Sequence, residues 1–119
     1  MKTHKDLIVW QKSIDFVTKL YKLTGAFPKE ELYGLVSQMR RAAVSIPSNI
    51  SEGAARQTDK EFLRFLYIAR ASGSEVETQL LIAENLDYFN SDQSQLKENL
   101  LEILKMLNSL INKIKQRIN

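Results

Sequence analysis

The sequence contains no cysteine and a single histidine, His4. Without cysteine the chain forms no disulfides, and thiolate catalysis and cysteine-ligated zinc or iron–sulfur sites are excluded. One histidine cannot supply the Glu-x-x-His pairs of di-iron bundles, and it leaves the many serines without a histidine base. We therefore predict a protein that is not an enzyme and that has no cofactor and no metal site.

Glycine and proline are also scarce, with four and two residues among 119. So few chain-breaking residues argue against a β-rich domain and favour long helices. No apolar run approaches the roughly 18 residues of a membrane span, and residues 1–12 lack the apolar segment of a secretory signal. We expect one domain over residues 1–119, in the cytoplasm and without membrane association.

The net charge of +3 is unevenly distributed along the chain. Residues 1–27, 40–74 and 96–119 each carry a net charge of +3, whereas residues 75–95 carry −5. This polarity permits a nucleic-acid-binding surface, and it equally permits head-to-tail contact between subunits.

The first apolar segment predicts a helix over about residues 7–24. Apolar residues spaced three and four apart share one helix face. On that basis one apolar face carries Leu7, Trp10, Ile14, Val17 and Tyr21. Val9, Phe16 and Leu20 widen this apolar surface. Gly25 follows the last periodic residue, where helices commonly end in a left-handed conformation.

Three further helices are predicted over about residues 33–52, over about residues 59–86, and after a cap at Ser91 or Asp92. The segment from Thr58 to Glu61 matches a capping box. The core stripe of the last helix consists of Leu96, Leu100, Ile103, Leu107, Leu110 and Ile114. That helix is apolar over more than one seam, which either completes the core or forms an oligomer interface. Four helices with short connections predict an all-α, antiparallel up-down-up-down four-helix bundle.

Residues 38–53 read QMRRAAVSIPSNISEG and place Pro47 inside an otherwise helical pattern. Because proline removes a helix hydrogen bond and clashes with the preceding turn, the helix is expected to bend or to be compensated. Asn49 and Glu52 are expected to satisfy freed backbone groups or to cap the helix end, and a polar binding site is the alternative. Gly53 is expected just beyond the helix end.

Cationic residues surround the turn between the second and third predicted helices. The candidates for binding phosphate are Arg40, Arg56, Lys60, Arg64 and Arg70. Guanidinium groups match phosphate geometry, and helical RNA is recognised mainly through its backbone and shape. The alternative is internal pairing, since an antiparallel hairpin places Arg41 level with Glu75, and Glu52 level with Arg64. Such pairs would fix the register of the two helices.

Five stretches recur together in one known family, namely residues 6–12 (DLIVWQK), 27–31 (FPKEE), 38–53, 61–66 (EFLRFL) and 75–80 (EVETQL). Over residues 5–89 the chain resembles the four-helix-bundle proteins of the 23S rRNA-intervening-sequence family. The resemblance implies a left-handed up-down bundle, a ring-like homopentamer in some members and an association with RNA. Ala71 stands where the family usually has glycine, and its methyl group is expected at a close helix contact.

Two functional hypotheses follow. The leading one is a homo-oligomer, a pentamer by resemblance, that binds structured RNA or a ribonucleoprotein through a basic surface. The alternative is a protein–protein scaffold that binds no nucleic acid and whose charge polarity serves assembly.

Overall fold

The structure is a computed structural model that describes residues 3–90 and 94–118. Its long helices are α1 (Ile8–Thr24), α2 (Leu35–Ala54), α3 (Asp59–Asn85) and α4 (Leu96–Ile118), and the short 3-10 helices are η1 (His4–Asp6) and η2 (Lys29–Glu31). No strand occurs among the described residues, so the all-α prediction is confirmed. Within the same residues, no helix is both long enough and apolar enough to cross a membrane.

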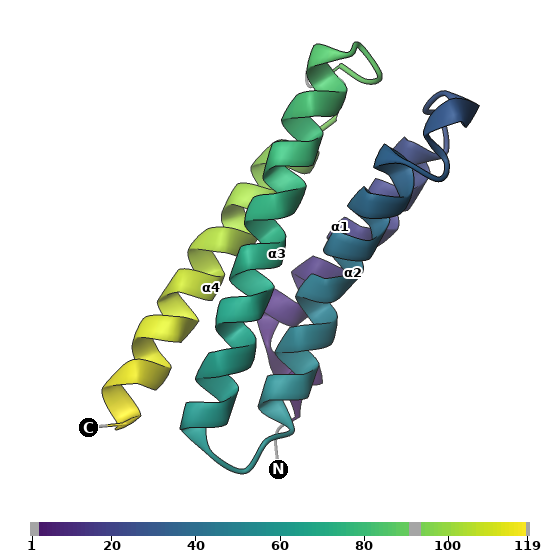
Figure 1. Ribbon diagram of the computed structural model, residues 1–119. Coiled ribbons are helices and arrows are strands. Elements are labelled where there is room, and N and C mark those ends of the chain that lie inside the picture. Colours follow the sequence, from purple (N-terminus) through teal and green to yellow (C-terminus); the bar gives the residue numbers. More distant parts are fainter. Residues whose placement is uncertain (1–2, 91–93, 119) are drawn as a thin grey trace.

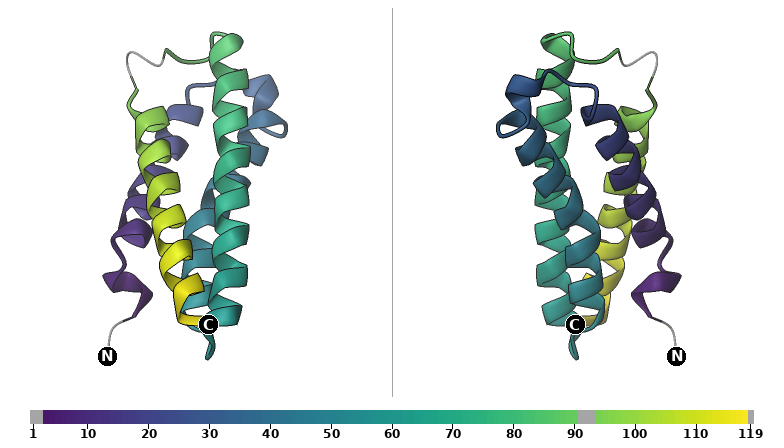
Figure 2. Two further views of the ribbon diagram at one scale, coloured as in Figure 1. Left: turned by 90° about the vertical axis from the view of Figure 1, so that its left-hand side faces the viewer. Right: turned by 90° about the vertical axis from the view of Figure 1, so that its right-hand side faces the viewer.

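The four long helices form an elongated bundle of 48 × 25 × 22 Å (Figure 1). Each helix packs mainly against two others, in the order α1, α2, α3, α4 around the bundle (Figure 2). Ion pairs show that α3 and α4 are antiparallel. Lys97 at the start of α4 pairs with Glu84 near the end of α3, at 2.9 Å. Arg117 at the end of α4 lies 3.6 Å from Asp59 at the start of α3.

The turn between α2 and α3 lies at the same end of the bundle as the start of α1 and the end of α4 (Figure 1). Close contacts between Gly53 and Phe62 on either side of this turn fit an antiparallel α2–α3 hairpin. The left-handed twist of the bundle stays a prediction.

The core face of α1 overlaps the predicted apolar surface and adds two polar residues to it. The buried residues are Val9, Ser13, Phe16, Leu20 and Thr24. Of the predicted apolar face, Leu7, Trp10 and Val17 are partly buried and pack against the core. The apolar spacing did not identify the polar residues Ser13 and Thr24 as core. The Ser13 and Thr24 hydroxyls donate 2.8 Å hydrogen bonds to the carbonyls of Trp10 and Leu20. These hydrogen bonds offset the cost of burying two polar side chains. Ile14 and Tyr21 are left substantially exposed.

The predicted stripe of α4 lies in the core, with one exception. Leu110 is only half-buried, and Ile111 is buried instead. The second apolar seam of α4 also packs against the core, through Leu104 and Leu110. Exposed apolar side chains remain on all four long helices, including Leu101 and Ile118 on α4.

Helix α2 continues through Pro47, whose ring is buried. The side-chain nitrogen of Asn49 donates 2.8 Å hydrogen bonds to both the carbonyl and the hydroxyl of Ser45. The Ser45 hydroxyl shares a further 2.8 Å hydrogen bond with that of Ser72 on α3. Asn49 thus hydrogen-bonds to Ser45, one turn before it in α2. Through Ser45 and Ser72, this hydrogen-bond network connects α2 to α3.

The predicted roles of two glycines are wrong. Gly25 has a φ of −62°, which is an ordinary right-handed value, and Gly53 lies inside α2. A Cβ atom on Gly53 would lie 2.8 Å from side-chain atoms of Phe62 and Phe65. Glycine is therefore needed at position 53 because α3 passes close by. The predicted close contact at Ala71 is also wrong, since Ala71 is exposed.

The starts of α3 and α4 use side-chain caps. The Thr58 hydroxyl accepts a 3.2 Å hydrogen bond from the Glu61 amide, which confirms half of the predicted capping box. The Glu61 carboxylate lies near arginines instead of completing the box. The predicted cap at Ser91 or Asp92 lies outside the described residues. The Ser94 hydroxyl accepts a 3.2 Å hydrogen bond from the Leu96 amide.

Candidate nucleic-acid interface

Arg40 is engaged within the fold. Its Nε donates a 3.0 Å hydrogen bond to Oγ1 of Thr24, and its Nη2 donates a 3.2 Å hydrogen bond to the carbonyl of Tyr21. The guanidinium carbon also lies 4.5 Å from the centre of the Tyr21 ring. A cation is favourable here because the carbonyls at the end of α1 concentrate negative charge. Arg40 therefore stabilises the contact between the end of α1 and α2, and it is not a candidate phosphate ligand.

Arg70 is also held by a neighbour within the bundle. Its Nη1 donates a 3.1 Å hydrogen bond to the side-chain oxygen of Asn108 on α4, and its guanidinium lies 4.9 Å from the centre of the Tyr67 ring. Arg70 is half-buried beside α4. The structure thus does not bring the five predicted phosphate ligands together in one patch.

The predicted pair of Arg41 and Glu75 does not form. Arg41 is exposed and has no hydrogen bond or ion pair within the part of the chain that the structure describes. One carboxylate oxygen of Glu75 accepts a 3.2 Å hydrogen bond from the Gln79 amide. The small side chains of Ser45 and Ser72 occupy the seam between α2 and α3, and they leave Arg41 and Glu75 on the outside.

The predicted pair of Glu52 and Arg64 is wrong as well, because both residues pair locally. Glu52 accepts a 3.2 Å hydrogen bond from Arg56, four residues on, and so does not act as a helix cap. Arg64 lies 3.6 Å from Glu61, three residues back. Neighbours at these spacings face each other on a helix surface, so short-range pairs form at lower entropic cost.

Three of the predicted ligands do gather, at the turn between α2 and α3. The guanidinium groups of Arg56 and Arg64 lie 4.8 and 4.5 Å from the centre of the Phe65 ring. Arg56 also lies 3.9 Å from Glu61. Lys60 is exposed and makes no hydrogen bond or ion pair with any described residue. A hollow of about 450 Å³ opens beside this turn, lined in part by Arg56 and Thr58.

Helix α4 also contributes to the cationic cluster at the α2–α3 turn, which the sequence did not predict. Lys115 and Arg117 lie in the last turn of α4, and Arg117 reaches Asp59 at the start of α3. The signal was the basic last turn, combined with the antiparallel order that brings residues 115–117 back to the α2–α3 turn. We name the resulting surface the hairpin-end surface, and it consists of Arg56, Lys60, Arg64 and Arg117.

Three carboxylates lie beside these four cations, those of Glu52, Asp59 and Glu61. The side chain of Arg64 is 59% exposed and that of Arg117 is 53% exposed. This arrangement presents cationic donors to solvent from two helices and a turn. Such a surface is suited to binding phosphate groups rather than to chemistry on a bound substrate.

Comparison with known proteins supports the family resemblance. The family described as 23S rRNA-intervening sequence protein matches residues 5–109. Comparison with curated proteins gives no match. A solved structure of a protein of unknown function, from the S23 ribosomal protein family of Bacteroides thetaiotaomicron, is 27% identical with a TM-score of 0.78. The similarity covers 88% of this chain and 96% of that chain. The chain belongs to the 23S rRNA-intervening sequence protein family.

Proposed function

We propose that this protein is a non-catalytic, self-associating helical-bundle protein of the cytoplasm that binds structured RNA, alone or in a ribonucleoprotein, through the hairpin-end surface. The observation that carries this proposal is the surplus of exposed cations there, with Lys60 free of protein partners among the described residues. Phosphate contacts supply most of the sequence-independent affinity for nucleic acid. A patch of this kind needs no further chemical group to bind RNA.

The ion pairs of Arg56 and Arg64 are compatible with this function. Both arginines and their carboxylate partners are well exposed, and exposed ion pairs contribute only about 0–1 kcal/mol. A phosphate group that approaches an arginine can therefore replace its carboxylate partner at small cost. Each guanidinium also has five N–H donors, so one arginine can hold a carboxylate and a phosphate together.

Self-association would serve the same function, because a single hairpin-end surface is small. Several copies held in one assembly would act on the same RNA together, and avidity would raise an affinity that is weak for each copy. A five-membered ring is the form that the family resemblance implies, and it stays a prediction.

The test is fluorescence anisotropy of a labelled structured ribosomal RNA fragment at two salt concentrations. We expect saturable binding that weakens steeply with salt, because bound cations release counterions from RNA. The Arg56→Glu/Lys60→Glu variant should lose this binding. The matched control is Lys22→Glu/Lys105→Glu, which changes the net charge equally at exposed positions outside the hairpin-end surface.

Two outcomes would contradict the proposal. Absence of binding at low salt and micromolar protein would overturn RNA binding for this class of RNA. An equal loss in the control variant would show that net charge, and not the hairpin-end surface, governs the affinity.

The alternative function is a scaffold that assembles but binds no nucleic acid. The observation in its favour is the apolar surface that the bundle leaves exposed on α1 and α2. Under that function, charge reversal at Arg56 and Lys60 should change the mass of the assembly, and there should be no RNA affinity to lose.

A further inference from the structure

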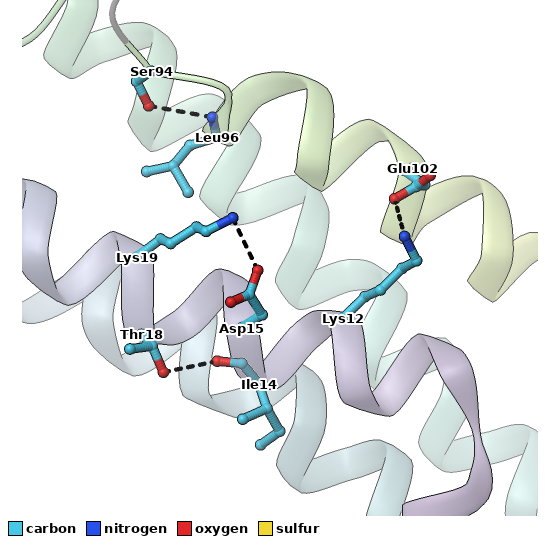
Figure 3. Close-up of polar contacts among 8 residues, drawn as sticks. All are labelled: Lys12, Ile14, Asp15, Thr18, Lys19, Ser94, Leu96 and Glu102. Carbon is cyan, nitrogen blue, oxygen red and sulfur yellow. Dashed lines mark hydrogen bonds and ion pairs between the residues drawn. The ribbon is translucent and has the colours of Figure 1, made fainter.

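An apolar groove runs between α1 and α2 on the outside of the bundle. It has a volume of about 280 Å³ and is lined by Trp10, Ile14, Val17, Val44, Pro47, Ser48 and Ser51. Ile14 is 41% exposed and Val44 is 39% exposed. Figure 3 shows the Ile14 side chain pointing away from α4, whereas Lys12 on the same helix reaches Glu102 on α4. The groove therefore lies outside the α1–α4 contact.

The floor and the rim of this groove differ in exposure. Trp10 and Val17 are partly buried and pack against the core, whereas Ile14 and Val44 are exposed to solvent. Single exposed apolar residues are common on soluble proteins, but exposed apolar residues that line one groove from two helices mark an interaction surface. Ile14 and Val44 would gain burial from an apolar partner.

An apolar stripe lies on α3, on a different side of the molecule. Ile68 is 39% exposed and Ile82 is 44% exposed. These two isoleucines are fourteen residues apart, and Glu75 lies midway between them on the same helix face. Ala71 is exposed one turn before Glu75, so a small side chain neighbours the carboxylate on this face.

The groove and the α3 stripe are complementary in charge and in spacing. Arg41 lies on α2 one turn before Val44, and it is the exposed cation without a described partner at the edge of the groove. Ser48, which lines the groove, follows Arg41 by seven residues, which is about 10.5 Å along a helix. From Glu75 to Ile82 is also seven residues. When Arg41 meets Glu75, an isoleucine of the α3 stripe is thus level with the groove.

We propose that the α1–α2 groove of one copy of this chain binds the α3 stripe of a second copy, with Arg41 of one copy facing Glu75 of the other. The groove and the stripe are different surfaces, so the contact is heterologous. Each added copy leaves one groove and one stripe free, and the assembly grows until a ring closes. This inference rests on the self-association in the proposed function and assigns its interface.

The test begins with two variants measured by light scattering coupled to size-exclusion chromatography. Val44→Asp blocks the groove and Ile82→Asp blocks the stripe, and each should be monomeric. An equimolar mixture should give a heterodimer of twice the monomer mass and nothing larger, because one intact groove meets one intact stripe. Leu101→Asp is the control, since Leu101 is 50% exposed on α4 and should leave the assembly unchanged.

A charge swap provides an independent test that does not depend on apolar positions. Arg41→Glu and Glu75→Arg should each weaken the assembly, shifting its dissociation to at least tenfold higher protein concentration. The combined Arg41→Glu/Glu75→Arg variant should recover the wild-type mass. Failure of the combined variant to recover, or a mixture of the two apolar variants that stays monomeric, would overturn the interface.

The experiments distinguish a failure of the proposed interface from a failure of the proposed RNA binding. If the wild-type protein is monomeric at micromolar concentration but binds the RNA fragment, the interface is wrong and RNA binding stands. If the protein assembles as described and has no affinity for RNA, the interface stands and RNA binding is wrong.

Discussion

Arg40 on α2 and Thr24 at the end of α1 are joined by a 3.0 Å hydrogen bond from the guanidinium Nε to the threonine Oγ1. The Thr24 hydroxyl in turn donates a 2.8 Å hydrogen bond to the carbonyl of Leu20. Because Thr24 is buried, its hydroxyl oxygen and proton both need partners within the protein. An arginine that looks like a surface cation in the sequence thus completes the hydrogen bonding of the α1 terminus.

Replacing Arg40 with alanine should lower stability rather than RNA affinity. The variant loses two hydrogen bonds from a charged donor at a helix C-terminus, and we expect the free energy of unfolding to fall by about 1–3 kcal/mol. Lys60→Ala is the control, and its effect should stay within about 0.5 kcal/mol. Urea denaturation measures both. Equal stability of the two variants would contradict the role given to Arg40.

Gly53 and Gly25 give a matched pair of substitutions. Gly53→Ala places a methyl group 2.8 Å from Phe62 and Phe65, so the free energy of unfolding should fall by about 1–3 kcal/mol through overpacking. Gly25→Ala has its nearest contact at 3.4 Å and a right-handed φ, so it should be neutral or stabilise by up to about 1 kcal/mol. Thermal unfolding followed by circular dichroism compares them. A tolerated alanine at position 53 would refute the close approach of α3.

The helices were predictable because their signals are local. The spacing of Leu100, Ile103 and Leu107 identifies the buried face of α4, and Thr58 marks the start of α3 through its hydroxyl. The apolar faces also require four helices to pack together. These features depend on a few neighbouring residues, which a sequence displays directly.

The buried face of α1 and the surroundings of the arginines were not predictable in this way. A face that buries Ser13 and Thr24 looks less apolar than its neighbour, so apolar spacing alone does not identify the centre of the buried face. Whether Arg40 caps a helix or faces solvent depends on where Thr24 lies in three dimensions. Arg117 joins Asp59 only because α4 returns to the start of α3. Such outcomes follow from tertiary contacts.

Tyr88 and Glu31 connect the two loops at the far end of the bundle from the hairpin-end surface. The Tyr88 hydroxyl donates a 2.8 Å hydrogen bond to one carboxylate oxygen of Glu31, and the other accepts a 3.3 Å hydrogen bond from the amide of Leu35 at the start of α2. The Tyr88 ring also lies 5.3 Å from that of Phe27. The hydrogen bond to Glu31 raises the pKa of Tyr88 above 10.0, and partial burial raises it further.

This raised pKa predicts a loss of stability in alkali. The folded protein retains the Tyr88 proton at a pH where the unfolded chain, with a tyrosine pKa of about 10, releases it. The stabilisation is therefore complete below about pH 10 and is lost as the pH rises through the folded-state value. Urea denaturation from pH 8 to pH 11 should show a smaller alkaline decline for Tyr88→Phe, which cannot ionise. The matched control is Tyr33→Phe, because Tyr33 is almost fully exposed, and it should follow the wild-type profile. Identical profiles for all three proteins would show that the Tyr88–Glu31 hydrogen bond does not contribute to stability.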